Sequence, residues 1–157
     1  MQNLANPDTS VSVTLSKRSL ASPLCSLEEP EGCVSKRVLL IDDEATLRRV
    51  TQLTLKKLAR WDVLVASSGH VGLQQAETEQ PDAILLDWMM PEMDGLATLI
   101  KLRENSATQH IPVILLTAKV QAMKQPQLQQ LNVAAIVVKP FEPEMLVLQI
   151  KAALGWS

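Results

Sequence analysis

Side chains able to take part in phosphoryl transfer stand directly after four short apolar runs of the chain. They are Asp42 and Asp43, Asp87, Thr117, and Lys139. Carboxylates brought together repel one another unless a cation neutralises them, and Mg²⁺ prefers oxygen ligands. A carboxylate beside such an ion can act as a nucleophile towards phosphorus, because the negative charge on the transferred group then meets fixed cationic partners.

These residue types predict a role for each position. We expect Asp87 to be the nucleophile, and one or two of the carboxylates of Asp42, Asp43 and Asp87 to hold Mg²⁺ together with a backbone carbonyl near Met89. Lys139 and the Thr117 hydroxyl would each face a further oxygen of the phosphoryl group. The remaining positions around the ion would be filled by water or phosphate.

Each residue taken alone has a simpler explanation. Asp42 and Asp43 could cap a helix and complement its dipole, and Asp87 could be a turn residue. Thr117 is a common type of strand end, and the stem of Lys139 could lie over apolar surface. Their joint occurrence at matching strand ends favours the chemical interpretation.

The elements that must position these residues follow from the hydrophobic pattern after residue 36. Five nearly continuous apolar runs alternate with segments of helical period, which predicts an α/β fold with a parallel sheet covered on both faces. The predicted strands are residues 37–41, 62–66, 83–86, 113–116 and 135–138, and the predicted helices are residues 44–59, 70–78, 96–103, 127–131 and 144–154. The carboxyl ends of parallel strands, where the polar residues stand, form the usual ligand-binding edge of such a sheet.

The helix predicted over residues 44–59 has the clearest apolar face. That face comprises Leu47, Val50, Thr51, Thr54, Leu55 and Leu58. Lys and Arg side chains fill the opposite face.

Composition restricts the possible partners. The 157 residues carry 15 basic and 17 acidic side chains, so a broad basic surface for direct nucleic-acid binding has no support. There is no apolar segment of the roughly 20 residues that a membrane span needs, and no signal peptide, so we predict a cytoplasmic protein without membrane contact. Residues 1–35 are rich in Ser, Pro and acidic residues and are expected to form a disordered leader of undefined role.

The motifs resemble, in their order and approximate spacing, those of the receiver domains of two-component response regulators. They are Leu39-Leu40-Ile41-Asp42-Asp43-Glu44, Asp87-Trp88-Met89-Met90-Pro91-Glu92-Met93-Asp94-Gly95, Leu116-Thr117-Ala118 and Val138-Lys139-Pro140-Phe141. The similarity covers about residues 36–157, which we take as one receiver domain. It implies a flavodoxin-like, doubly wound, five-stranded sheet of order 2-1-3-4-5 with five helices.

The resemblance also implies roles for individual residues. Asp42 and Asp43 resemble the acidic pair that holds Mg²⁺, with Asp43 the more direct ligand, and Asp87 resembles the phosphoacceptor. Thr117 resembles the switch hydroxyl, Lys139 the family's cation, and the Lys139-Pro140 bond is expected to be cis. Ile136 departs from the family, because many members have an aromatic side chain there that turns inward on activation.

These expectations predict a signalling domain, and no enzyme beyond its own phosphorylation and dephosphorylation. A histidine kinase or phosphotransfer protein would donate the phosphoryl group, and a separate protein effector would read the altered surface. Since Trp156-Ser157 directly follows the last predicted helix, we expect a stand-alone receiver whose output is protein contact.

Two alternatives stay open. A binding-only pseudo-receiver adaptor would lack an acidic, Thr or Lys residue of the set, and none is missing. A phosphatase of the haloacid dehalogenase type would carry Asp-x-Asp after the first strand, where this chain has Asp42-Asp43-Glu44.

Overall fold

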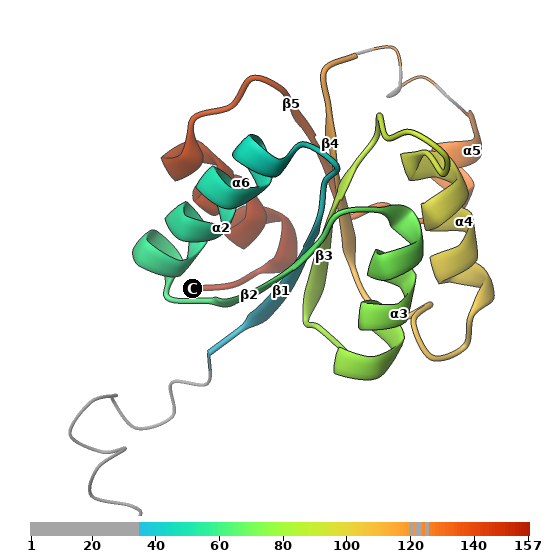
Figure 1. Cartoon of the computed structure of the whole chain (residues 1–157), viewed down its shortest axis with the longest axis horizontal. Coiled ribbons are helices and arrows are strands. Elements are labelled where there is room, and N and C mark those ends of the chain that lie inside the picture. The colour runs from blue at the N-terminus through green and yellow to red at the C-terminus, as the bar shows by residue number, and fades with distance from the viewer. Residues whose placement is uncertain (1–34, 120, 122–123, 125) are drawn as a thin grey trace, which may run out of the picture. The chain divides into compact units, whose positions relative to one another are not determined.

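The fold is known from a computed structural model that describes residues 35–119, 121, 124 and 126–157. Figure 1 shows a central sheet with helices on both sides. Residues 1–34, nearly all of the leader expected over residues 1–35, lie outside the described residues. No helix in the described part of the chain is long and apolar enough to cross a bilayer.

Five parallel strands form the sheet, and their order is β2-β1-β3-β4-β5. The strands are β1 (Arg37–Ile41), β2 (Asp62–Ala66), β3 (Ala83–Asp87), β4 (Val113–Thr117) and β5 (Ala135–Val138). This confirms the predicted order and places β1 and β3 side by side, where the direction of winding reverses.

Helices cover both faces of the sheet. They are α2 (Ala45–Ala59), α3 (Gly69–Glu79), α4 (Gly95–Glu104), α5 (Pro126–Gln130) and α6 (Pro143–Leu154). In Figure 1, α2 and α6 lie on one side of the sheet and α3, α4 and α5 on the other. The five predicted helices are therefore confirmed within the described residues, with boundaries that differ by at most one residue.

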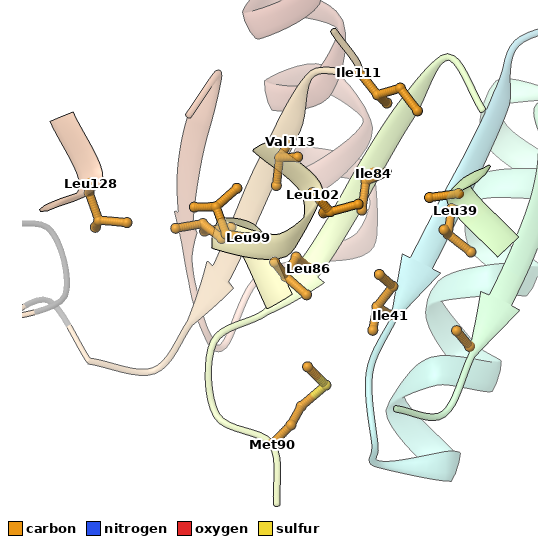
Figure 2. Packing of buried hydrophobic residues seen from close by; sticks show 13 residues of the cluster. Leu39, Ile41, Ile84, Leu86, Met90, Leu99, Leu102, Ile111, Val113 and Leu128 are labelled. Carbon is orange, nitrogen blue, oxygen red and sulfur yellow. The ribbon is translucent and has the colours of Figure 1, made fainter. Parts of the chain in front are cut away.

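The strand side chains alternate between two apolar clusters because successive residues of a strand point to opposite faces. Leu39 and Ile41 of β1 join the cluster under α3, α4 and α5, whereas Val38 and Leu40 join the cluster under α2 and α6. Figure 2 shows the first cluster, in which Leu99 and other apolar residues of the covering helices meet the strand residues. Burial on both faces explains why the strand sequences are apolar throughout.

Helix α2 buries a narrower face than its sequence predicts. Thr51 and Leu55 are buried, but Val50 is 47% exposed and Leu58 is 51% exposed. Neighbouring helix residues are about 100° apart around the axis, so Val50 turns away from the sheet when Thr51 faces it. The predicted face of α2 was therefore wrong at these two positions.

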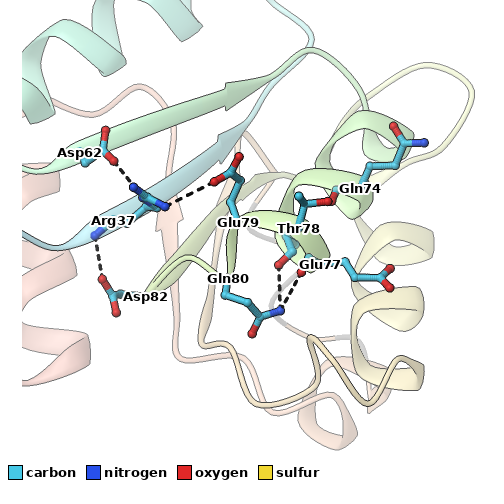
Figure 3. A network of polar contacts seen from close by, with 9 residues as sticks. Arg37, Asp62, Gln74, Glu77, Thr78, Glu79, Gln80 and Asp82 are labelled. Atoms are coloured by element: carbon cyan, nitrogen blue, oxygen red, sulfur yellow. Dashed lines mark hydrogen bonds and ion pairs between the residues drawn. The ribbon is translucent and has the colours of Figure 1, made fainter.

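Polar contacts at the amino end of the sheet join β1 to its surroundings. Arg37 pairs with Asp62 at 2.8 Å and with Glu79 at 3.4 Å, and its backbone N–H donates to Asp82 at 2.7 Å (Figure 3). These side chains are exposed, so each ion pair contributes at most about 1 kcal/mol. Their effect is to set the starting positions of β1, β2 and β3, at the opposite end of the strands from the predicted chemistry.

Aromatic side chains also meet near this end of the sheet. The rings of Trp61 and Trp156 pack edge to face with centroids 5.2 Å apart, and the Lys36 ammonium lies 5.3 Å from the Trp156 ring centroid. Such contacts add to the apolar burial of both rings. They connect Trp156, two residues after α6, to Trp61 and Lys36, which directly precede β2 and β1.

Candidate functional site

The sheet brings four of the predicted residues to one edge. Asp87 and Thr117 are the last residues of β3 and β4, and Asp42 and Lys139 directly follow β1 and β5. These four strands are consecutive neighbours in the sheet. Their carboxyl ends therefore present the side chains next to one another, as the sequence predicts.

Strand alternation decides which of these side chains meet. Asp42, Asp87 and Lys139 each stand two residues after a member of the α2–α6 cluster, namely Leu40, Leu85 and Val137. Thr117 stands two residues after Leu115, which belongs to the other cluster. Side chains two residues apart in a strand point to the same face of the sheet. Asp42, Asp87 and Lys139 therefore point to one face, and Thr117 points to the other.

Three carboxylates and one ammonium group form the centre of the site. Oxygens of Asp42, Asp43 and Asp87 all lie within 4.8 Å of one another. The Lys139 Nζ atom lies 3.1 Å from Asp87 Oδ1 and 3.5 Å from Asp42 Oδ2. Asp42 and Asp87 are 1% and 4% exposed, whereas Asp43 is exposed.

These acids border a cleft that opens to solvent. Its volume is about 430 Å³, and its lining comprises Asp43, Glu44, Asp87, Met89, Ala118 and Lys139. The buried Asp87 and the exposed Asp43 thus line the same accessible space. Asp87 is therefore reachable from solvent through this cleft.

The acidic donor set fits a hard divalent cation. Carboxylate oxygens are the ligands that Mg²⁺ prefers, and two or three of them suffice because the ion keeps several waters. Asp42, Asp43 and Asp87 would hold it. The Met89 amide donates to Asp87 Oδ1 at 3.3 Å, and the role of a carbonyl near Met89 as a further ligand stays a prediction.

The electrostatics of Asp87 reflect its burial. Burial raises the pKa of this carboxyl from 3.8 to about 6, and the neighbouring charge of Asp42 acts in the same direction. The Lys139 ammonium and the Met89 amide oppose this rise in pKa because they stabilise the ionised form. The carboxylate is therefore mostly ionised at neutral pH yet poorly solvated, a state suited to a nucleophile.

The Thr117 hydroxyl makes no hydrogen bond to the acids in the described part of the chain. It accepts a hydrogen bond from the Lys119 amide at 3.0 Å and donates to the Lys119 carbonyl at 3.3 Å. The side chain is fully buried. Its hydroxyl is thus engaged by the backbone of the loop that follows β4.

The loop between β3 and α4 depends on a glycine. The Gly95 amide donates to the Trp88 carbonyl at 2.9 Å. A Cβ atom at Gly95 would lie 2.7 Å from Trp88 Cα and 2.8 Å from the Asp87 carbonyl oxygen, closer than ordinary contacts allow. Asp94 caps α4 by accepting from the Ala97 amide at 2.8 Å. The first turn of α4 therefore lies against the backbone that carries Asp87.

Two contributors to the site were not among the predicted residues. Glu44 lines the cleft, and its amide donates to Asp42 Oδ1 at 2.9 Å. Arg48 was counted only among the basic residues opposite the apolar face of its helix, but it is half-buried and its guanidinium donates to the Asp42 carbonyl at 2.6 Å. The only sequence signal was its spacing: Arg48 is the fourth residue of α2, and a long side chain there can reach back past the start of the helix to Asp42.

Ile136 stands where many receiver domains have an aromatic side chain. It is half-buried against the α3–α4–α5 cluster. Together with Leu128, Gln129, Val133 and Ala135 it lines a hollow of about 370 Å³ between α5 and β5. The aliphatic side chain has no ring to turn inward, in agreement with the sequence.

Comparison with known proteins defines the class. The response regulator receiver domain family matches residues 38–151. The chain therefore belongs to the receiver domains of response regulators, which accept phosphoryl groups in two-component signalling and are not enzymes in the ordinary sense. The Lys139-Pro140 peptide bond is cis, as the resemblance implied.

Particular relatives support this assignment. The chain is 34% identical over 124 residues to the alkaline phosphatase synthesis transcriptional regulatory protein PhoP of Bacillus subtilis (strain 168), covering 79% of this chain and 50% of that protein. It is 28% identical to the structure of the chemotaxis response regulator CheY4 of Vibrio cholerae, with a TM-score of 0.71 and coverage of 76% and 99%.

A third relative was solved with its ion. It is the receiver domain of the sensor histidine kinase PA1611 from Pseudomonas aeruginosa PAO1, which has magnesium coordinated in its active site cleft. The identity is 25%, the TM-score is 0.67, and the match covers 78% of this chain and 99% of that structure. Receiver domains bind Mg²⁺ at their acidic pocket, and this chain has such an acidic cluster.

The chain spans about half the length of the curated relatives that it matches. The expected stand-alone organisation, the protein effector and the cytoplasmic location therefore stay predictions.

Proposed function

We propose that Asp87 accepts a phosphoryl group from a histidine kinase or phosphotransfer protein in a Mg²⁺-dependent reaction, and that the phosphorylated form changes which proteins this chain contacts. One observation carries the proposal: Lys139 Nζ lies 3.1 Å from Asp87 Oδ1 and 3.5 Å from Asp42 Oδ2, among three carboxylates whose oxygens lie within 4.8 Å.

In the proposed reaction, a carboxylate oxygen of Asp87 attacks phosphorus. The new O–P bond gives an acyl phosphate, and the bond from phosphorus to the donor breaks, with the electron pair leaving on the donor histidine nitrogen. Bound Mg²⁺ would neutralise negative charge shared by the carboxylates and the phosphoryl oxygens. Lys139 offers a fixed positive charge 3.1 Å from Asp87 Oδ1 and needs no proton transfer to do so.

Thr117 is proposed to connect the phosphorylated site to the surface. Its hydroxyl bonds to the backbone of Lys119 in the unphosphorylated chain. New phosphoryl oxygens on Asp87 offer it stronger, charged acceptors. Moving the hydroxyl towards them would draw the loop after β4 inward and shift a two-state equilibrium of that loop and the helix after it.

Phosphorylation by a small donor tests the proposal without knowledge of the kinase. The protein is incubated with acetyl phosphate and Mg²⁺, and its intact mass is measured. We expect the mass of one added phosphoryl group, which is absent when EDTA removes the metal or when Asp87→Asn replaces the nucleophile. Asp62→Asn, a change of carboxylate at the amino end of the sheet, is the matched control and should be phosphorylated normally.

A wild-type chain that gains no phosphoryl group would refute this function. The alternative, a binding-only pseudo-receiver adaptor, would then account for the same fold. Mass gained by the Asp87→Asn variant would refute the assignment of the acceptor residue alone.

A further inference from the structure

Asp42 has each of its polar groups engaged. Its amide donates to the Ala66 carbonyl at 3.1 Å, and Oδ1 accepts from the Glu44 amide at 2.9 Å. Oδ2 lies 3.5 Å from Lys139 Nζ. Its carbonyl oxygen, the fourth group, accepts from Arg48 Nη1 at 2.6 Å. Three of these contacts come from backbone or from a residue of the proposed site, and Arg48 comes from the second turn of α2.

The bond from Arg48 fixes the peptide group that joins Asp42 to Asp43. A guanidinium donor makes a short and strong hydrogen bond to a carbonyl. Because the carbonyl of Asp42 and the amide of Asp43 share one rigid plane, the bond also restrains the direction in which Asp43 leaves the strand. Asp43 is the exposed acid of the cluster, and no described hydrogen bond or ion pair holds its side chain.

The charge of Arg48 acts on the same cluster. The ion pairs found among the described residues do not include Arg48, so its positive charge is not matched by a partner of its own. It therefore adds to Lys139 in offsetting the repulsion among the carboxylates, and it approaches from the side of α2. Unlike Lys139, it makes no hydrogen bond to a carboxylate.

We propose that Arg48 is a positioning residue for the metal site, which holds the Asp42–Asp43 backbone in the arrangement that binds Mg²⁺ and touches neither the ion nor the phosphoryl group. The inference rests on the proposed function, because it assumes that these acids bind Mg²⁺. Groups that orient metal ligands from outside typically change metal affinity by roughly 10- to 100-fold when removed.

Arg49 supplies a matched control at the next position. It is exposed, and its guanidinium bonds to Gln52 on the same helix at 3.3 Å. Arg49→Gln removes the same charge as Arg48→Gln, one residue away, without touching Asp42. Arg48→Lys keeps the charge but loses the planar guanidinium, so it separates the electrostatic effect from the geometric one.

The experiment measures the dissociation constant for Mg²⁺ from the rise in the free energy of unfolding with Mg²⁺ concentration. Phosphorylation by acetyl phosphate is followed in parallel at limiting and at saturating Mg²⁺. We expect Arg48→Gln to raise the dissociation constant roughly tenfold, Arg49→Gln to change it less than about twofold, and Arg48→Lys to lie between them. The rate at saturating Mg²⁺ should fall far less than the rate at limiting Mg²⁺.

Equal dissociation constants for Arg48→Gln and Arg49→Gln would overturn the inference, as would an equal loss of rate at limiting and saturating Mg²⁺. Unfolding in EDTA shows whether Arg48→Gln is folded. If it is not, the Mg²⁺ dissociation constants of Arg48→Lys and Arg49→Gln are compared instead, and equal values would again overturn the inference. If the wild type itself bound no Mg²⁺, the proposed function would fail first, and this inference with it.

Discussion

At the scale of single residues, Asp87 combines burial with proximity to another acid. Burial raises its pKa from 3.8 to about 6 in the metal-free fold. Between these two values the folded chain binds more protons than the unfolded chain. The stability that comes from protonated Asp87 is therefore fully present below pH 3.8 and is lost as the pH rises through about 6.

This linkage predicts how Asp87→Asn changes stability with pH. In EDTA, the variant should gain free energy of unfolding relative to the wild type as the pH rises from about 4 to about 7.5, because amide 87 carries no charge to desolvate. Urea unfolding at several pH values measures the difference. Glu92→Gln, an exposed acid in the same loop, controls for loss of a charge. A difference between wild type and Asp87→Asn that stays constant or shrinks with rising pH would contradict the burial argument.

The sequence predicts that the acids, Thr117 and Lys139 stand at strand ends because each follows an apolar run, and the structure places them there. The sequence did not predict the hydrogen bonds of the Thr117 hydroxyl. The run from Val113 to Leu116 is apolar throughout, so the two faces of the strand cannot be told apart in it. Arg48 was missed for another reason. Its hydrogen bond is to a backbone carbonyl, which every residue has, so the residue types do not indicate it.

At the scale of elements, the approach of α4 to the β3 strand end positions the loop that carries Asp87. Gly95 permits this approach because a Cβ atom there would meet the backbone of Asp87 and Trp88 at 2.8 and 2.7 Å. The Asp94-Gly95 pair, which resembles an ordinary turn in the sequence, is thus a helix cap followed by a close packing contact. The close packing of Gly95 depends on the end of β3, whose position cannot be predicted from the sequence around Gly95.

Gly95→Ala is predicted to impair phosphorylation more than stability. The added methyl group must push α4 or the loop aside, and a displacement of about 1 Å at a reacting group can cost roughly 100-fold in rate. The rate of phosphorylation by acetyl phosphate should fall at least about tenfold. Gly155→Ala is the control, because Gly155 has a φ of 69° and open space around it at the far end of α6. It should cost stability but leave the rate unchanged, and equal rates for both variants would contradict the packing argument.

Element boundaries were predictable to within one residue, whereas the width of the buried face of α2 was not. Thr51 and Leu55 face the sheet as expected, but Val50 and Leu58 are about half exposed. An apolar residue in a helical pattern shows only that it can be buried. Whether it is buried depends on the neighbouring layer, which the sequence of α2 does not contain.

At the scale of the whole molecule, the order of the strands determines which residues meet at the site. Placing β1 beside β3 and β5 at the far edge brings residues 42, 87 and 139 together although they are widely separated in the chain. The apolar runs alone predict a covered parallel sheet, but they do not rank its possible strand orders. The order 2-1-3-4-5 came from the resemblance to receiver domains, and the structure confirms it.

The central claim is that Asp87, and no other acid of the cluster, receives the phosphoryl group. Borohydride reduces an acyl phosphate of aspartate to homoserine, so treating the acetyl phosphate reaction with borohydride and sequencing the peptides by mass spectrometry identifies the acceptor directly. The account predicts homoserine at position 87 only, and only when Mg²⁺ is present. Homoserine at position 42 or 43, or a phosphoryl group recovered on a hydroxyl side chain, would contradict it.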